Sequence, residues 1–411
     1  MKDHSIAAGS RPGAATAHRA NVVPATLLTL IILTQLPSAL TLTVTAPLLA
    51  AMGADLIEPG ASPFLIKLVT GIVAPALIIG APLAGWLADR HDRRPLLIGF
   101  GAVFIGAAVA PAFLNDVMAI VVSRFFAGAC SGALSTIGMA MVGTYFDERR
   151  RPGMIGTMAF LTLSASVLTL PVAGALADTG WRNAFYIFLA LIPLVVLASL
   201  RPLPAPGRET PDAAAPRKAR GWPRIPFALL IIAFVNGLAL NLAGIFYSFY
   251  FTELGVPNVT TISLLLMYQA LVGGITTLLF GRAAARLSSK SIFVVCMTCA
   301  VLGLGIQGLA TDWRVAGVSL TFTGIAMGWL VANISTTTIA LVDEYHRGAA
   351  LGIIRAISSI ATLIGIIQPL QAALGIKGIF LSVAAICALV LIGLASGALP
   401  LRRIDAAAER P

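Results

Sequence analysis

The stretch that decides the fold is residues 85–94, with the sequence GWLADRHDRR, between two long apolar runs. Asp89 closes the first run, and the arginines that follow it are Arg90, Arg93 and Arg94. Arginines beside an apolar run anchor its end at the cytoplasmic surface of a membrane. Anchoring does not require an acidic residue at the lipid boundary, so Asp89 predicts a further role as a helix cap or as the partner of an arginine.

The composition around this stretch excludes most soluble proteins. Of 411 residues, 58% are apolar and 11% are charged, and the mean hydropathy is +0.92. An ordinary soluble domain has roughly 25% charged residues. So few polar side chains cannot cover a water-soluble surface, and the same numbers exclude a disordered chain and a disulfide-rich scaffold. The composition therefore predicts a polytopic membrane protein.

Apolar segments long enough to cross a membrane recur along the whole chain. A membrane-spanning helix needs about 20 mostly apolar residues. By that measure we expect an all-α membrane protein with twelve transmembrane helices in two six-helix bundles. The predicted helices begin near Pro24, Phe64, Pro95, Val117, Gly153, Asn183, Phe227, Ile262, Ser291, Arg314, Gly348 and Ile376.

One connection is much longer than the others and divides the chain. Residues 201–225 are rich in prolines and basic residues, and we expect them to form a solvated linker. The linker separates a first bundle at 22–200 from a second bundle at 226–400. Short tails are predicted at 1–21 and 401–411.

The positive charge of the chain predicts its orientation. Lysines and arginines number 28 against 17 aspartates and glutamates, which gives a formal charge of +11. Most of the basic residues fall in the tails, the linker and alternate connections, whereas the other connections hold Arg182, Arg314 and Lys377. This bias predicts an inner-membrane protein with both termini in the cytoplasm. Nucleic-acid binding is not expected, because the basic residues lie between apolar runs and do not line one face with interleaved aromatic residues.

The two bundles are predicted to be pseudo-symmetric copies of one another. A shift of 196 residues aligns charged residues as well as glycines, which composition alone does not explain. Two such repeats facing one another are typical of transporters that alternate access to a site near the middle of the membrane. The aligned pairs include Asp116 with Asp312, Gly128 with Gly324, Gly132 with Gly328, and Arg151 with Arg347.

The loop at 85–94 resembles the signature loop of the major facilitator superfamily, G-x-L-A-D-R-x-G-R-R. It departs at Asp92, where the family usually has glycine, and the second repeat has Ala285 in place of the aspartate. The resemblance implies a secondary transporter in which this loop takes part in gating. Gly85 itself is expected to let two helices approach closely. The matching residues are Gly85, Leu87, Ala88, Asp89, Arg90, Arg93 and Arg94.

Two further segments resemble motifs of the same family. Arg124 is followed by Gly128 and Gly132, similar to the family's helix-four motif, which implies a role for Arg124 in coupling or substrate contact. The alternative is that the Arg124 side chain reaches the outer lipid headgroups. Pro171 and Gly174 match part of a motif associated with antiporters, G-P-x-x-G-G, although a proline kink alone is equally compatible with them.

Polar residues inside apolar runs are candidates for the substrate cavity. In the family, the first, fourth, seventh and tenth helices line that cavity. An interhelical hydrogen bond is an equally good explanation for any single Asn or Gln. Gln269 and Gln368 also lie inside apolar runs. The cavity candidates are Gln35, Arg124, Asn236, Asn241 and Asn333, together with Arg355, which has the alternative of reaching the cytoplasm.

The sequence predicts transport rather than catalysis. No phosphate-binding G-x-x-x-x-G-K-[ST] occurs, and no cluster of residues suggests a metal or another cofactor. We expect a monomeric, non-enzymatic secondary transporter in the lipid bilayer that exports small organic compounds. The alternatives are an uptake symporter for an anionic metabolite and a membrane-embedded protein that does not transport. Arg124 and Arg355 lie within predicted helices, and no carboxylate lies mid-span to balance their charge, so we expect a neutral or anionic substrate. The candidate coupling ion is a proton.

Overall fold

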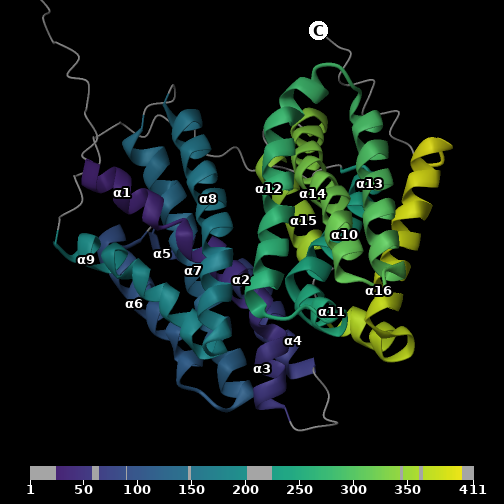
Figure 1. The fold of residues 1–411 in the computed structure, drawn as a ribbon. Helices are drawn as coiled ribbons and strands as arrows, with labels where there is room; N and C mark the ends of the chain where they lie inside the picture. Colours follow the sequence, from purple (N-terminus) through teal and green to yellow (C-terminus); the bar gives the residue numbers. More distant parts are fainter. Residues whose placement is uncertain are drawn as a thin grey trace, which may run out of the picture.

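The structure of the protein is a computed structural model that describes residues 25–57, 64–88, 90–146, 150–200, 225–342, 346–360 and 364–399. Both predicted tails, Asp89 and residues 201–224 of the predicted linker at 201–225 lie outside these described residues. Every regular element in them is helical. Figure 1 shows two groups of helices side by side, one from the residues before 201 and the other from the residues after 224.

The first half contains six membrane-spanning segments, and several of them are interrupted. The first segment is interrupted next to Pro37 and Pro47. Proline has no backbone N–H to donate, so it interrupts the hydrogen bonds of a helix. The elements are α1 (Ala25–Leu33), α2 (Leu36–Thr45), η1 (Ala46–Leu48) and α3 (Leu49–Leu56); α4 (Phe64–Gly71) and α5 (Val73–Ala88); α6 (Arg93–Val109) and η2 (Ala110–Ala112); α7 (Val117–Tyr145); α8 (Arg151–Asp178); and η3 (Trp181–Leu191) with α9 (Ile192–Leu200).

The second half repeats this arrangement. Its first segment has a π-helical turn in the middle, at η4. The elements are α10 (Phe227–Asn241), η4 (Leu242–Phe246) and α11 (Tyr247–Glu253); α12 (Val259–Ala284); α13 (Ser289–Leu309); α14 (Trp313–Leu341); α15 (Arg347–Ile360); and α16 (Ile364–Ala395).

Eleven helices of the described residues are long and apolar enough to cross a membrane, against the twelve predicted. The predicted eleventh helix is represented by the shorter α15 and by the beginning of α16, with residues 361–363 between them outside the described part. Within α16 the backbone turns at Gly375, where φ is 70°, and the last long segment covers Ala373–Ala395.

The structure reproduces the repeat of 196 residues at the level of helix ends. Helices α7 and α14 have 29 residues each and occupy equivalent positions in the two halves. Each begins after an aspartate that caps it: Asp116 accepts a hydrogen bond from the backbone of Ala119 at 2.8 Å, and Asp312 accepts one from Arg314 at 2.8 Å. A carboxylate at this position satisfies a backbone donor that the helix leaves free.

Glycines of the repeat allow helix backbones to touch. A Cβ atom built on Gly132 would lie 2.4 Å from the carbonyl oxygen of Leu77, on the neighbouring helix α5. In the second half, a Cβ on Gly328 would lie 2.4 Å from the carbonyl oxygen of Gly273, on α12. Because no side chain fits, these pairs pack as small-residue contacts between membrane helices. Gly128 and Gly324 make the same approach one turn earlier.

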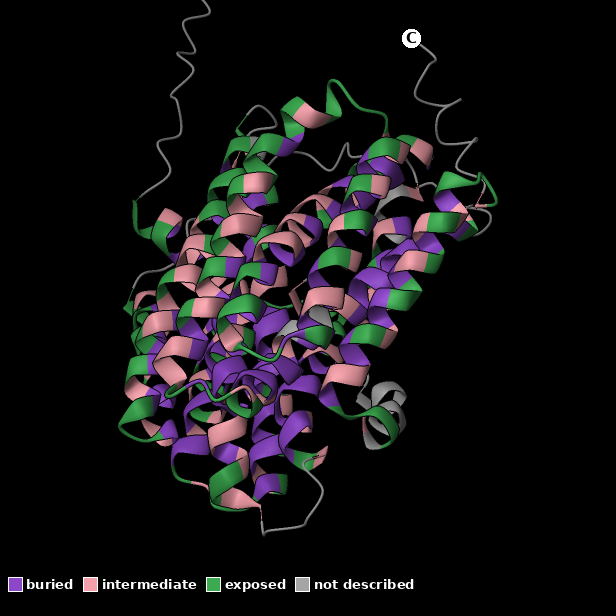
Figure 2. Cartoon of the chain, turned by 45° about the vertical axis from the view of Figure 1, so that its right-hand side comes forward, coloured by how far each residue is buried: buried purple, intermediate pink, exposed green. Residues whose placement is uncertain are grey.

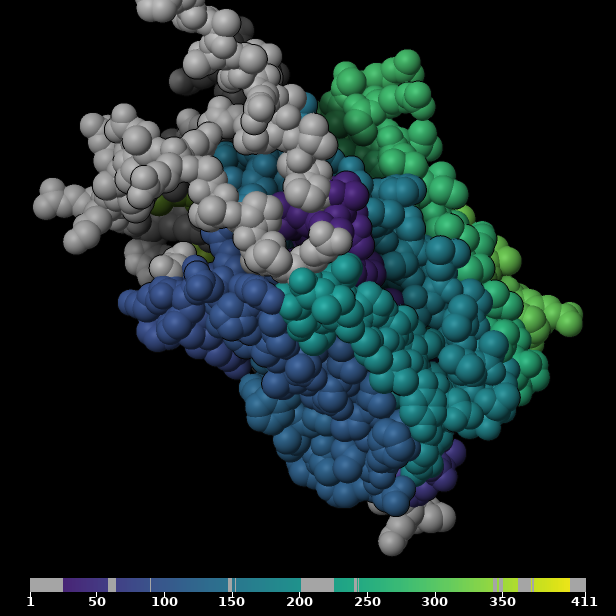
Figure 3. All heavy atoms as spheres, turned by 90° about the vertical axis from the view of Figure 1, so that its left-hand side faces the viewer, coloured from purple at the N-terminus to yellow at the C-terminus, as the bar shows by residue number. Residues whose placement is uncertain are grey.

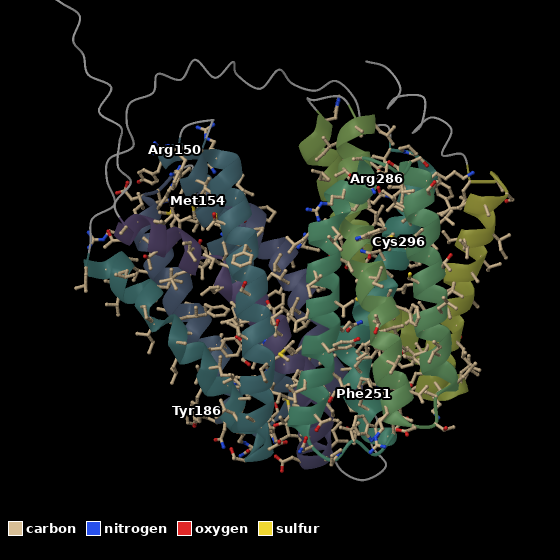
Figure 4. The ribbon with its side chains drawn as sticks, turned by 45° about the horizontal axis from the view of Figure 1, so that its top comes forward. Arg150, Met154, Tyr186, Phe251, Arg286 and Cys296 are labelled. Carbon is tan, nitrogen blue, oxygen red and sulfur yellow. The ribbon has the colours of Figure 1, made fainter. Side chains whose placement is uncertain are left out.

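The two ends of the molecule differ in how the halves meet. We call the end that carries Arg150 and Arg286 the basic end, and the end that carries Tyr186 and Phe251 the far end (Figure 4). Hydrogen bonds join the halves at the far end: the hydroxyl of Ser248 on α11 donates to the carbonyl of Pro47 at 2.8 Å. In Figure 2, buried residues gather toward the lower part of the molecule, where the halves meet.

The outer surface is apolar. On the side of the first half, α6, η3 and α9 cover the face turned to the viewer in Figure 3. Val103 and Leu200, on two of these helices, are 50% and 71% exposed, and Phe113 beyond α6 is 70% exposed. Exposed apolar side chains at this density match a lipid environment rather than water. The chain is a multi-pass membrane protein.

We expect Gly132→Ala to destabilise the protein, because its new Cβ meets a backbone carbonyl and α5 must move away. Overpacking of this kind typically costs about 1–3 kcal/mol. Gly143→Ala on the same helix is the matched control, since nothing lies within 4 Å of a Cβ placed there. The melting temperature of purified protein in detergent should fall for Gly132→Ala alone, and equal melting temperatures would contradict the packing argument.

Candidate functional site

A cavity of about 940 Å³ lies between the two halves. Helix α8 of the first half and helices α12 and α14 of the second half form its walls. The lining runs over 156–168, 266–278 and 324–335, which is the middle of α12 and lies nearer to the basic end on α8 and α14. The volume is in the range of pockets that hold small organic molecules.

Among the described residues, the cavity wall carries no ionisable side chain. Glycine and apolar residues dominate it, and large apolar side chains such as Phe160, Leu163 and Leu278 line it. A charged ligand would lose its hydration here without gaining a partner of opposite charge. The polar residues of the wall are Ser164, Gln269, Thr277 and Ser335.

Gln269 is a polar side chain of the wall that forms hydrogen bonds to other helices. It is buried on α12, and its amide nitrogen Nε2 donates to Thr323 Oγ1 at 2.8 Å and lies 3.5 Å from Tyr247 Oη. Tyr247 in turn donates to Gln307 Oε1 at 3.2 Å. Three helices and α11 thus share one buried hydrogen-bond network. The sequence marks Gln269 as polar within an apolar run, but that pattern does not predict a network.

The π-helical turn η4 places Tyr247 in this network. It ends at Phe246, directly before Tyr247, and a π turn shifts the helical register of the residues after it. Tyr247 stacks on Phe380 with ring centroids 5.7 Å apart, so its ring is fixed from the other side. A register shift of this kind leaves no mark in the hydrophobic pattern, which is why the sequence did not reveal it.

Arg124 is buried inside the first half and does not line this cavity. It has no exposed surface, and its Nη2 donates to the carbonyl of Thr41 at 2.5 Å and to Thr45 Oγ1 at 2.9 Å, both on α2. Its guanidinium lies 5.5 Å from the ring centroid of Phe188. Nε and Nη1 of Arg124 have no hydrogen-bond partner among the described residues. The alternative that Arg124 reaches the outer headgroups is wrong, because the side chain is enclosed.

Two of the other predicted cavity residues join neighbouring helices within one half. Gln35, at the break between α1 and α2, donates to the carbonyl of Ser135 on α7 at 3.1 Å. Asn333 on α14 donates to the carbonyl of Ser289 at the start of α13, at 3.0 Å. Neither is among the residues that line the cavity. Their hydrogen bonds fit the alternative of interhelical contact.

The remaining candidates also lie away from the lining of this cavity. Asn236 is buried on α10, and its Oδ1 has no partner among the described residues. Arg355 on α15 is exposed. The side chain of Asn241 lies outside the described part. A role of these residues in substrate binding stays a prediction.

The signature loop fastens the helices of the first half at the basic end. Arg93 donates to Thr144 Oγ1 at 2.7 Å, and Arg94 donates through Nε to the carbonyl of Ala198 at 3.0 Å. Arg90 is exposed and lies 4.2 Å from the ring centroid of Trp86. These contacts connect α6 with α7 and α9.

The close helix approach expected at Gly85 lies elsewhere. A Cβ on Gly85 would meet only Thr136, at 3.9 Å, which is ordinary contact. Five residues earlier, a Cβ on Gly80 would lie 1.9 Å from the carbonyl oxygen of Ala129. The structure therefore places the glycine contact of α5 further from the loop than the motif suggested.

Pro171 and Gly174 lie where the halves join at the far end. Helix α8 continues through Pro171, and a Cβ on Gly174 would lie 2.8 Å from Cα of Thr260 on α12. Asp178, at the end of α8, accepts hydrogen bonds from the backbone of Val259 at 2.8 Å and from Thr260 Oγ1 at 2.6 Å. This segment closes the space between α8 and α12 beyond the cavity.

A buried lysine crosses the same junction. Lys67 on α4 has no exposed surface, and its Nζ donates to Oε1 of Gln371 on α16. The ammonium lies 4.9 Å and 5.4 Å from the ring centroids of Phe246 and Phe249. Glu253 is near enough to attract it electrostatically. The first half therefore places a charge in a pocket made by the second half.

The described residues contain no group of His, Cys, Asp and Glu that could hold a metal ion.

Comparison with known proteins gives consistent relatives. The multidrug resistance protein MdtL of Klebsiella pneumoniae is 25% identical over 161 residues, which are 37% of this chain and 41% of MdtL. The chloramphenicol resistance protein of Streptomyces lividans is 26% identical over 272 residues, which are 62% of this chain and 66% of that protein. The chain thus aligns with less than half of MdtL and with about two thirds of the chloramphenicol resistance protein.

Solved structures match the fold over nearly the full length. The crystal structure of the D-xylose-proton symporter superposes with a TM-score of 0.74 at 16% sequence identity. The match covers 90% of this chain and 96% of the symporter chain. The nucleoside transporter NupG gives a TM-score of 0.71 with 13% identity, covering 90% and 99%. The sequence model of the Major Facilitator Superfamily matches residues 31–227 and 229–411. Together with the signature loop and the two packed repeats, this match shows that the chain belongs to the Major Facilitator Superfamily.

Proposed function

We propose that this protein is a secondary transporter that exports neutral small organic compounds from the cytoplasm by alternating access. The observation that carries the proposal is the uncharged cavity between the two halves. Two relatives are named for drug resistance, which supports export. The two halves are the units 22–200 and 226–400, and the chain acts as a monomer.

The orientation follows from the basic end facing the cytoplasm, as the charge bias predicts. In that orientation the cavity lies on the cytoplasmic side, and the far-end contacts of Ser248 and Asp178 close the opposite side. The structure then corresponds to an inward-facing state, ready to receive a substrate from the cytoplasm. Release requires the far end to open while the basic end closes.

The cavity favours neutral over anionic substrates. The sequence predicted a neutral or anionic substrate, and the anionic alternative depends on Arg124 and Arg355 facing the cavity, which neither of them lines. Arg124 is instead enclosed by α2 and the rings of η3, with two nitrogen atoms that have no partner among the described residues. We assign Arg124 to coupling with the proton gradient rather than to substrate contact. The bond from Arg124 to Thr41 connects α7 to the interrupted first segment, which in turn contacts α11.

Arg124→Gln should therefore lower the rate of gradient-driven transport about tenfold or more without changing which substrate charge is preferred. A hydrogen bond to a charged group contributes about 1.5–3 kcal/mol, and the variant loses that contribution. Proteoliposomes with an imposed proton gradient and matched neutral, anionic and cationic compounds provide the measurement. Arg124→Lys, which keeps the charge, should retain part of the rate.

Arg314→Gln is the control for that experiment, because Arg314 is exposed at the far end. Melting temperatures of all variants separate a folding defect from a transport defect. If the wild type prefers anions and Arg124→Gln loses that preference, Arg124 contacts the substrate. That result would contradict the proposal that the substrates are neutral.

Lys67→Met should shift the protein toward the state that is open at the far end, because the bond to Gln371 and the contact with the two phenyl rings are lost. A hydrogen bond with a charged partner contributes about 1.5–3 kcal/mol, which changes a two-state ratio about tenfold or more. Spin labels at Phe113 and Leu309, both exposed and equivalent in the repeat, report the far-end distance. The distance should lengthen in Lys67→Met.

The matched control is Lys377→Met, at the same end but without a hydrogen bond across the halves among those found in the described residues. If both lysine variants give the wild-type distance, Lys67 does not hold the far end closed.

A further inference from the structure

We propose that the side-chain carbonyl oxygen of Gln269 is a substrate-binding acceptor, and that the transported compounds are mainly apolar, neutral molecules that carry a hydroxyl or N–H donor. This inference rests on the proposed function, because it names the substrate class of the same cavity. It depends on which end of the Gln269 amide faces the cavity and on what else the cavity offers a ligand.

Thr323 fixes the orientation of the Gln269 amide. A threonine hydroxyl has one hydrogen to donate. Thr323 Oγ1 donates its hydrogen to the carbonyl of Leu320 at 3.2 Å, so toward Gln269 it can only accept. The atom of Gln269 that lies 2.8 Å away must therefore be the NH₂ nitrogen and not the oxygen.

Tyr247 supports the same orientation from a second direction. Its hydroxyl hydrogen is donated to Gln307 Oε1, which leaves the phenolic oxygen as an acceptor for Gln269 Nε2. The two hydrogens of the amide nitrogen are thus directed to Thr323 and Tyr247, with the sulfur of Met327 a further neighbour at 3.5 Å. What Gln269 has left is its carbonyl oxygen.

This oxygen is a carbonyl acceptor that the wall leaves available to a ligand. No hydrogen bond to Gln269 Oε1 is found among the described residues, and Gln269 is part of the cavity lining. The hydroxyls of Thr277 and Ser335 donate to carbonyls of their own helices, at 2.7 Å and 2.9 Å, so they have no hydrogen left to donate to a ligand. A fixed acceptor in an uncharged apolar space favours a neutral ligand that supplies a donor over an analogue that lacks one.

The opposite wall explains why the ligand is otherwise apolar. Helix α8 contributes Phe160, Leu163, Val167 and Leu168, and Ser164 is its one polar residue in the described lining. A ligand that bonds to Gln269 therefore meets an apolar surface from the first half. Because its two sides contact different halves, its binding affects the relative position of the halves, as alternating access requires.

The test compares an aryl alcohol with its methyl ether, matched in size, for binding to and transport by the purified protein in detergent and in proteoliposomes. Wild type should bind the alcohol about tenfold more tightly than the ether. Gln269→Met keeps the length of the side chain and removes the acceptor, so the preference should disappear while the affinity for the ether stays. Thr298→Val, an exposed change on α13 outside the cavity, should keep the preference.

Tyr247→Phe tests the positioning role of the network without touching the ligand contact. It removes one of the two acceptors that fix the amide, so the alcohol preference should fall severalfold with little change for the ether. A preference that persists in Gln269→Met, or that is missing in wild type while both compounds are transported, would overturn the assignment of Gln269 alone. If wild type transports neither neutral compound, the proposed function itself fails.

Discussion

Direct contact between helix backbones is the constraint on which the rest of the structure depends. Gly132 against Leu77 and Gly328 against Gly273 bring α7 onto α5 and α14 onto α12 without intervening side chains. In lipid there is little hydrophobic gain from helix association, so packing of this kind and polar contacts must hold each half together. Each half becomes a stiff body, and movement is left to the boundary between the halves. The cavity and the far-end contacts both lie on that boundary.

Two buried cations show how the protein accommodates charge without burying a carboxylate beside it. Arg124 uses the carbonyl and hydroxyl oxygens of α2, where the helix is interrupted near Pro47, whereas Lys67 uses an amide oxygen and two aromatic faces of the other half. The first arrangement lies within one half and keeps its partners when the halves move. The second spans the boundary, so the proposed opening of the far end would separate its partners. The two cations therefore differ in which conformational change they respond to.

The sequence was sufficient for the architecture because lipid imposes simple rules. Segment length and the 196-residue repeat predicted helices whose ends agree in both halves, as Asp116 and Asp312 illustrate. The interior of the helices was harder to predict. The π turn before Tyr247, the turn at Gly375 and the shift of the close contact from Gly85 to Gly80 depend on three-dimensional register. The cavity residues were also missed, because polar residues on helices seven and eight look alike in sequence whether they bond to a neighbour or face a ligand.

The two halves contribute different chemistry to the cavity, although the fold around it is a duplication. The hydrogen-bond network belongs to the second half, whereas α8 offers an almost featureless apolar wall. A duplicated fold allows its two copies to specialise, and our proposal gives one copy the recognition of a functional group and the other the apolar contact. Substrate range can then diversify through a few positions on α12, α13 and α14 while the rocking scaffold is inherited intact. Related transporters with different substrates are expected to differ most in that one half.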